Sequence, residues 1–170
     1  GIKKASGEYI AFLDADDIWK KDKIEYQLQF MESNKALISH TSYEVLNKNN
    51  EVSNVRKAKD YNSYHSLLYS CDIGLSTVMV KKELLKNDIL FPNLKTKEDF
   101  VLWLKILKIN VKIYALDEKL SFWRKLDNSL SSSISQKIKD GYCVYNKFMK
   151  FNIFKSLFFL FLLSFNSLFK

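Results

Sequence analysis

The stretch that decides the fold is GEYIAFLDADDIW, residues 7–19. Its residues 9–13 form an apolar run that is typical of a buried strand. Three carboxylates, Asp14, Asp16 and Asp17, follow that run directly. Because ligands of open α/β sheets bind beyond the carboxyl ends of the strands, we predict a ligand site immediately after this strand.

Strand and helix patterns alternate along the rest of the chain, which predicts an α/β fold with a mixed sheet and flanking helices. We expect a helix over 21–33, a strand over 37–45, a turn over 47–50, a polar connector over 52–62, a short helix over 63–69, a β-rich segment over 75–81, a helix over 98–109, strands over 111–116 and 119–123, and a loop over 129–133. In the helix over 21–33, Ile24, Leu28 and Met31 are expected to face the core, with Gln27 off that stripe.

Composition excludes several classes of protein. The 170 residues are 47% hydrophobic and 15% aromatic, with only 4 Gly, 1 Pro and 2 Cys, so collagenous, low-complexity and disulfide-rich chains are excluded. The net charge is +8, but Arg56 and Arg124 are the only arginines, which argues against a nucleic-acid partner.

The positive charge concentrates in a tail, residues 134–170, that is also rich in Phe and Leu and is predicted to be helical to its end. Such a composition favours a peripheral contact with an anionic membrane surface. The apolar segment 153–169 is short and interrupted for a membrane span and carries apolar residues all round the helix, so packing on protein stays an alternative. We therefore divide the chain into a main domain, 1–133, and this tail.

Crowded carboxylates repel one another, and a divalent cation relieves that repulsion. Mg²⁺ and Mn²⁺ prefer hard oxygen ligands and usually bind through one or two carboxylates together with substrate phosphates. The acidic cluster Asp14, Asp16 and Asp17 therefore predicts a metal and diphosphate site. The structural alternative is a solvated turn in which Asp17 caps the next helix.

A second acidic pair, Glu98 and Asp99, opens the apolar helix over 98–109. The pair could serve structure alone, because Thr96 followed by an acid three residues later is a variant of the capping box. Combined with the first cluster, it supplies a carboxylate that is free to act as general base on an incoming hydroxyl.

Three further residues are candidates for binding substrate. Arg124, at the end of a predicted strand, could reach a phosphate. Ser76 and Thr77 lie in the β-rich segment, where alternation would turn one hydroxyl inward to line a sugar site. Arg124 could equally be an ordinary surface residue, and for Ser76 and Thr77 the pattern favours ordinary strand residues.

Taken together, these motifs resemble family 2 glycosyltransferases of the GT-A fold, and within them enzymes of bacterial cell-surface polysaccharides of the teichuronic-acid type. Residues 1–19 with KIEYQ at 23–27 resemble the central motif, whose DxD piece is matched by Asp14-Ala15-Asp16. EDF at 98–100 with LWL at 102–104 matches the ED motif. LSFWR at 120–124 with SLS at 129–131 resembles the strand and serine-rich loop that follow.

The resemblance implies an inverting transfer of a sugar from a nucleotide-sugar donor, most commonly a UDP-sugar, to a hydroxyl of a polysaccharide or lipid-linked glycan. It implies that Asp16 binds Mn²⁺ or Mg²⁺, that Asp14 lies by the ribose or sugar side of the donor, and that Asp99 is the general base. Glu98 would support the acceptor side, and Arg124 would contact the diphosphate.

The resemblance also implies a location in the cytoplasm, at the inner face of the bacterial plasma membrane. The chain begins at Gly1, a few residues before a central strand, so we expect it to be the C-terminal portion of a GT-A domain without the nucleotide-binding half.

Two other functions stay open. One is a phosphotransferase of the haloacid-dehalogenase type with Asp14 as nucleophile and Asp16 as acid/base, although Ile18 and the extra Asp17 depart from that pattern. The other is a non-catalytic, membrane-associated interaction module that uses the tail.

Overall fold

The computed structural model describes residues 1–86, 89–125 and 133–168. A six-stranded mixed sheet forms its centre, with strand order β1-β5-β3-β6-β2 and β4 paired with the second half of β3. The bounds are β1 Tyr9–Ala11, β2 Ile18–Trp19, β3 Ile38–Leu46, β4 Val52–Arg56, β5 Met79–Lys81 and β6 Tyr114–Arg124. β3 and β6 run parallel, and the other described pairs are antiparallel.

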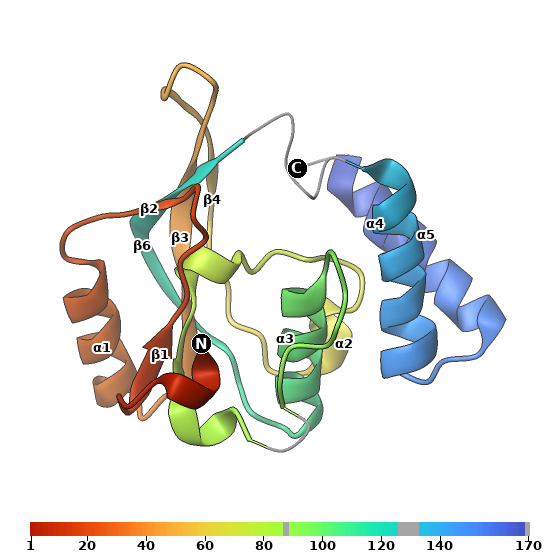
Figure 1. Cartoon of the computed structure of the whole chain (residues 1–170), viewed down its shortest axis with the longest axis horizontal. Helices are drawn as coiled ribbons and strands as arrows, with labels where there is room; N and C mark the ends of the chain where they lie inside the picture. Colours follow the sequence, from red (N-terminus) through yellow and green to blue (C-terminus); the bar gives the residue numbers. More distant parts are fainter. Residues whose placement is uncertain (87–88, 126–132, 169–170) are drawn as a thin grey trace.

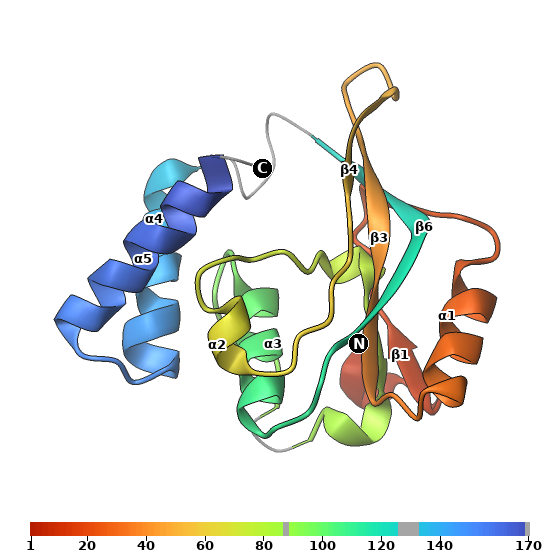
Figure 2. The same cartoon turned by 180° about the vertical axis from the view of Figure 1, so that it is seen from behind.

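Helices cover both faces of this sheet, and the predicted α/β class with flanking helices is confirmed (Figures 1 and 2). Helix α1, Lys23–Ser33, lies on one face, and α2, Tyr64–Leu67, and α3, Glu98–Lys108, lie on the other. α4, Ile134–Cys143, and α5, Ile153–Leu168, form an outer layer beyond α2 and α3.

The predicted helix at the acidic pair becomes the centre of the hydrophobic core. α3 is apolar all round, and its residues Phe100 to Leu104 are completely buried. A helix that is apolar on every side must be covered on every side. The sheet covers α3 from one side, and Val144, Tyr145 and Leu163 of the C-terminal tail belong to the same core cluster.

The buried face of α1 agrees with the prediction at Met31 but not at Ile24 or Gln27. Lys23, Gln27 and Met31 are buried, whereas Ile24 is 41% exposed. The pattern failed because Gln27 is hydrogen-bonded inside: its Nε2 donates to the carbonyl oxygens of Ser39 and Thr77, at 3.2 and 3.0 Å. A polar side chain that finds such partners can replace an apolar one at a buried position.

Two predictions about strands are also corrected. The segment predicted as a polar connector contains β4, none of whose residues is buried, so no buried face marks it in the sequence. The two short strands predicted over 111–116 and 119–123 are one strand, β6. The register of β6 against β3 shifts between Leu116 and Lys119, which marks a bulge. In the sequence, this bulge has the pattern of a break between two strands.

The tail is helical as predicted, but it is interrupted and it packs on the main domain. α4 continues into a π-helical turn, Val144–Phe148. Lys150, with φ +58°, follows this turn. The side chain of Asn152 then accepts a hydrogen bond from the backbone N–H of Lys155 in the first turn of α5. Asn166 Nδ2 donates to the carbonyl of Tyr69 at 2.8 Å. In the part of the chain that the structure describes, no helix has the length and apolar character needed to cross a bilayer.

Candidate active site

The three carboxylates lie in the loop between β1 and β2, as the sequence predicts, and Ser76 holds this loop in place. The backbone N–H of Asp14 donates to Ser76 Oγ at 3.0 Å, and Trp19 Nε1 donates to the Ser76 carbonyl at 2.7 Å. A hydrogen bond from Ser76 also lowers the pKa of Asp17, against the larger effect of burial, which raises it. The backbone N–H of Arg124 donates to Asp17 Oδ1 at 3.2 Å, so the loop is anchored from two sides.

The start of α3 forms the opposite wall. Lys97, the residue before the helix, has φ +63°, a left-handed conformation that non-glycine residues adopt rarely. Thr96 donates from its backbone N–H and its Oγ1 to Asp140 Oδ2 of α4, at 2.9 and 3.0 Å. The structural alternative, a capping box at Thr96, is therefore not formed: the Thr96 hydroxyl donates to Asp140 of α4, and Lys97 makes no side-chain cap.

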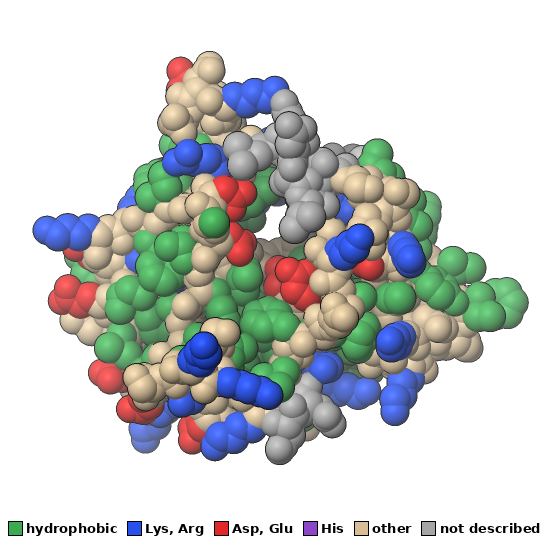
Figure 3. All heavy atoms as spheres, viewed as in Figure 1, with side chains coloured by type: hydrophobic (Ala, Val, Ile, Leu, Met, Phe, Trp, Pro, Cys, Tyr) green, Lys and Arg blue, Asp and Glu red, His purple; other side chains and the backbone are tan. Residues whose placement is uncertain are grey.

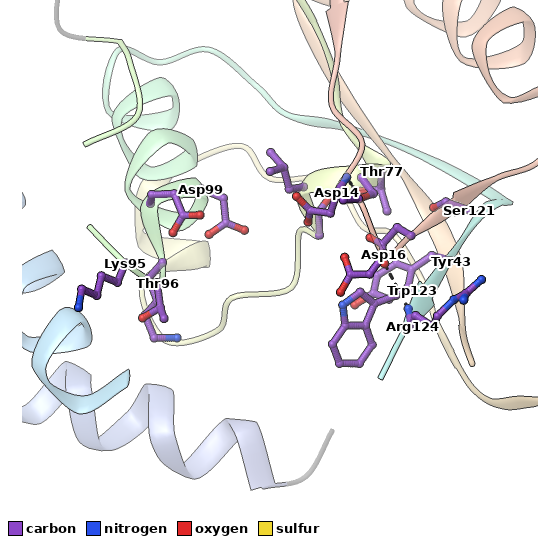
Figure 4. Close-up of a pocket in the computed structure, with 17 residues that line it drawn as sticks. Asp14, Asp16, Tyr43, Thr77, Lys95, Thr96, Asp99, Ser121, Trp123 and Arg124 are labelled. Carbon is purple, nitrogen blue, oxygen red and sulfur yellow. Dashed lines mark hydrogen bonds between the residues drawn. The ribbon is translucent and has the colours of Figure 1, made fainter. Parts of the chain in front are cut away.

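These two walls enclose one pocket of about 570 Å³. All seven residues that the sequence singled out line it: Asp14, Asp16, Ser76, Thr77, Glu98, Asp99 and Arg124. Figure 4 shows Asp99 on the α3 side, across the pocket from Asp14, Asp16 and Arg124. In the space-filling view, acidic side chains gather on both sides of a hollow at the middle of this face (Figure 3). The fold therefore brings together carboxylates that are more than 80 residues apart in the sequence.

The charges in this pocket are crowded enough to perturb one another. The pKa of Asp14 is raised, first by burial and then by the negative charges of Asp16 and Glu98. Burial is the main cause that raises the pKa of Asp99 to about 6, with Glu98 and Asp14 acting in the same direction. The N–H of Phe100, which donates to Asp99 Oδ1 at 2.6 Å, acts in the opposite direction. Groups with pKa values shifted in this way inside a pocket are typical of functional sites.

The donor set suits a divalent cation that arrives with substrate. Asp14 and Asp16 offer hard carboxylate oxygens, and after burial the negative charge of Asp16 is the next cause that raises the pKa of Asp14. Within 1–86, 89–125 and 133–168, no three His, Cys, Asp or Glu side chains stand close enough to hold an ion by themselves. A site with two carboxylates therefore fits Mg²⁺ or Mn²⁺ only if other oxygens, such as phosphate oxygens, complete the coordination.

Arg124 also brings a positive charge to the pocket, which suits an anionic ligand. Arg124 lines the pocket, and its Nε is buried with no hydrogen-bond partner among the residues that the structure describes. Buried donors are nearly always paired, so a ligand oxygen is a natural partner for this atom.

The prediction for Ser76 and Thr77 needs correction. They lie in a 3-10 turn, Leu75–Thr77, and not on a strand, so alternation does not apply to them. Both are buried, and Thr77 Oγ1 donates to the carbonyl of Gly74 at 2.6 Å. Their hydroxyls are thus engaged in holding loops, although both residues still line the pocket.

Sequence reasoning missed some residues of the pocket. Tyr43 of β3 lines it beside Ser121, its register partner on β6, and burial raises the pKa of Tyr43 to about 12. Lys97 also lines it. The parallel register of β3 and β6 and the left-handed conformation of Lys97 carry no signal in the sequence that could have found them. The serine-rich loop at 129–131 lies outside the described residues.

The fold has clear structural relatives. It superposes on crystal structures of TarS from S. aureus, with a TM-score of 0.65 for TarS 1–349 in complex with UDP-GlcNAc. That match covers 86% of this chain and 43% of the TarS chain at 23% identity, so it establishes the GT-A type of fold.

Sequence similarity to a family model and to a relative identifies the family of the chain. Residues 1–87 match the family model described as glycosyl transferase family 2, and an uncharacterized glycosyltransferase of Haemophilus influenzae is 33% identical over all of this chain and 68% of its own length. The chain belongs to glycosyl transferase family 2. The haloacid-dehalogenase alternative is therefore excluded.

Two relatives carry more specific names. TuaG of Bacillus subtilis, a glycosyltransferase provisionally assigned to teichuronic acid biosynthesis, is 33% identical over 91% of this chain. WfgD of Escherichia coli, named as a UDP-Glc:alpha-D-GlcNAc-diphosphoundecaprenol beta-1,3-glucosyltransferase, is 38% identical over 88% of it. The chain spans 62% of TuaG and 58% of WfgD.

Proposed function

We propose that this chain forms the acceptor and metal side of a glycosyltransferase that moves a sugar from a nucleotide-sugar to a hydroxyl of a cell-surface polysaccharide or lipid-linked glycan. The observation that carries the proposal is the pocket in which Asp14 and Asp16 face Asp99. A metal-diphosphate pair stabilises the leaving group and a separate base removes the acceptor proton, which together suit a sugar transfer with inversion.

The relatives support both substrates of the proposed reaction. One crystal structure of TarS is a complex with UDP-GlcNAc, and WfgD is named for a UDP-glucose donor and a diphosphoundecaprenol-linked acceptor. We therefore propose a UDP-sugar as donor.

In the proposed site, Asp16 holds Mn²⁺ or Mg²⁺ and Asp14 lies by the ribose or sugar of the donor. When bound, the cation neutralises negative charge on the diphosphate as it leaves. Arg124, with its unpaired Nε, contacts the same diphosphate. Ser76 and Thr77 line the pocket; the Ser76 hydroxyl holds the acidic loop, and the Thr77 hydroxyl holds its own turn through the carbonyl of Gly74.

Asp99 is proposed as the general base. The acceptor oxygen forms a bond to the anomeric carbon, the bond from that carbon to the diphosphate oxygen breaks, and the nucleotide diphosphate leaves with the electron pair. The acceptor proton moves to the Asp99 carboxylate. With a pKa of about 6, Asp99 is mostly ionised at pH 7 and is a stronger base than an ordinary aspartate. Glu98, whose charge raises that pKa, is proposed to support the acceptor side.

The tail is proposed to bring the enzyme to the inner face of the bacterial plasma membrane. Phe154, Phe158, Phe161 and Phe165 are 48–85% exposed and follow one another at intervals of four, three and four residues, so they share one face of α5. An exposed apolar stripe on a basic segment suits peripheral contact with an anionic bilayer.

Replacing Asp16 tests the metal assignment. In the complete gene product, assayed with UDP-sugars, Mn²⁺ and a mixture of glycan acceptors, Asp16→Asn should lower the transfer rate by at least about 100-fold, since metal stabilisation is worth several kcal/mol. Asp22→Asn is the matched control, because Asp22 is exposed and outside the pocket. Equal rates for Asp16→Asn and wild type would remove Asp16 from the site.

A further inference from the structure

A second pocket, of about 720 Å³, adjoins the first between the main domain and the tail. Six residues line both pockets: Tyr43, Gly74, Thr96, Lys97, Asp99 and Trp123. Asp99 therefore lies at the junction of the first pocket, which is polar and acidic, and the second pocket. The volume is within the range of about 300–1,000 Å³ in which proteins enclose small organic ligands.

The wall of this second space, here called the tail groove, is mostly apolar. It includes Ile73, Ile134, Ile138, Leu160, Phe161 and Leu163. Its inner part is buried, since Ile73 and Leu163 are 2% and 5% exposed. Its outer part reaches the surface, because Ile134, Ile138 and Phe161 are 50–73% exposed. The groove thus runs from the surface that carries the phenylalanine stripe of α5 to Asp99.

Two lysines supply the positive charge of the groove wall, which also carries the Asp99 carboxylate. Lys97 and Lys137 both line it. The stem of Lys97 lies against α4, with Cε 3.8 Å from the point where a Cβ on Gly141 would lie, and its positive charge lowers the pKa of Asp99. An apolar wall with two lysines, of which Lys97 acts on the pKa of Asp99, complements a ligand that joins an alkyl chain to an anionic group.

We propose that the tail groove binds the alkyl diphosphate part of a lipid-linked acceptor, so that the first sugar of that acceptor lies at Asp99. The inference rests on the proposed function and narrows it, because it selects the lipid-linked acceptor over a free polysaccharide. The alkyl chain lies along Ile138, Phe161 and Leu163, and the diphosphate is held by Lys97 and Lys137. The tail is then part of the acceptor site as well as a membrane contact.

The binding of farnesyl diphosphate to the purified protein tests this directly, using titration calorimetry at concentrations below those at which the lipid aggregates. We expect saturable binding at least about tenfold tighter than that of inorganic diphosphate or of farnesol, because each lacks one of the two recognised parts. Binding of inorganic diphosphate as tight as that of farnesyl diphosphate would contradict the apolar half of the proposal. Equal binding of farnesol would contradict the part assigned to the lysines.

Two isoleucines offer a matched pair of variants. Ile138 is 50% exposed and lines the groove, whereas Ile153 is 59% exposed on the tail and outside it. Ile138→Asp should weaken farnesyl diphosphate binding at least about tenfold, since burial of one aliphatic side chain against a ligand is worth 1.5–3 kcal/mol. Ile153→Asp should change it less than about twofold. Equal effects of the two variants would mean general adhesion to the tail and would overturn the groove assignment.

The transfer assay separates failure of this inference from failure of the proposed function. An enzyme that transfers sugar to a lipid-free glycan but does not bind farnesyl diphosphate keeps the proposed function and loses the groove. Binding of farnesyl diphosphate that depends on Ile138, in a protein that transfers no sugar, would support the groove assignment and contradict the proposed function. Displacement of farnesyl diphosphate by a lipid-free oligosaccharide would show that the groove binds glycan, and would also overturn the inference.

Discussion

At the scale of single residues, Ser76 shows how a small side chain determines the shape of the acidic loop. It meets Asp14, Asp17 and Trp19 through its hydroxyl and its carbonyl, although it lies about 60 residues away in sequence. Its backbone carbonyl and side chain thus hold both ends of the loop. A hydroxyl that fixes the backbone of a binding loop contributes to preorganisation and does not need to touch substrate.

Lys23 is a second residue whose environment was not predictable. It is fully buried under the ring of Trp19, with Nζ 4.3 Å from the ring centroid and no hydrogen-bond partner among the described residues. Burial lowers the pKa of Lys23 to about 7. In the unfolded chain the same amine titrates near 10.4, so the charged form is disfavoured by folding.

This difference makes stability depend on pH. Between pH 7 and about 10 the unfolded chain binds the proton that the folded Lys23 has lost, so stability rises with pH, by about 3 kcal/mol from pH 7 to 9.5. Lys23→Met should be more stable than wild type at pH 7 and should lack this rise. Urea unfolding at both pH values measures it, with the exposed Lys21→Met as control. A rise in stability that persists unchanged in Lys23→Met would contradict the buried position.

At the scale of elements, α4 positions the start of α3. Asp140 is buried and accepts both hydrogen bonds from Thr96, immediately before the left-handed Lys97 and the acidic pair. This contact joins the tail to the segment that presents Asp99. Burial alone would raise the pKa of Asp140, but hydrogen bonds from Gln136 and Thr96 stabilise the carboxylate and lower it.

Asp140→Ala should destabilise the protein by about 1–3 kcal/mol, because it leaves buried donors of Thr96 unpaired. Asp140→Asn keeps an acceptor oxygen and should lose less. Since the folded pKa is the lower one, the stability that Asp140 contributes is present above its unfolded pKa near 3.9 and is lost as pH falls below it. Urea unfolding of the three proteins at pH 7 and at a pH about one unit below the unfolded pKa measures both effects. Equal stabilities at pH 7 would show that α4 does not secure this segment.

The elements also show what could be predicted from the sequence. β1, α3 and the acidic loop were predicted because their apolar runs and carboxylates are local in the chain. The buried face of α1 and the continuous β6 were not, because Gln27 satisfies its amide through distant carbonyls and the bulge after Leu116 hides the pairing with β3. Local patterns record periodicity, whereas such tertiary contacts override it.

The same division applies to the candidate site. The seven predicted residues line one pocket. They could be predicted because their side-chain types and local sequence patterns indicate a chemical role. Tyr43 and Lys97 were missed because register and backbone conformation bring them there. The roles of the seven residues stay predictions until they are measured.

At the scale of the whole molecule, the tail has two different faces. One packs on the main domain through Tyr145, Leu163 and Asn166, and the other exposes the phenylalanine stripe of α5. The apolar residues expected all round the segment 153–169 thus lie on two sides of the helix, one packed on the main domain and one exposed.

The exposed side should bind anionic vesicles. We expect wild type to co-sediment with vesicles of phosphatidylglycerol but weakly with phosphatidylcholine, and Phe154→Asp/Phe158→Asp to lower the bound fraction at least about tenfold. Val52→Asp/Val55→Asp is the control, because those valines are 51% and 39% exposed on β4, away from the tail. Equal losses in both double variants, or no vesicle binding by wild type, would contradict the membrane contact.

The central claim is that Asp99, presented across the pocket from Asp14 and Asp16, removes the acceptor proton. The most direct measurement is the pH profile of sugar transfer by the complete gene product and its Asp99→Asn variant, beside metal-dependent binding of the UDP-sugar. The wild-type rate should fall as pH drops through about 6, where Asp99 takes up a proton. The variant should transfer about 10²–10⁴-fold more slowly while donor binding stays unchanged. An Asp99→Asn enzyme with the wild-type rate and the same pH profile would contradict the account.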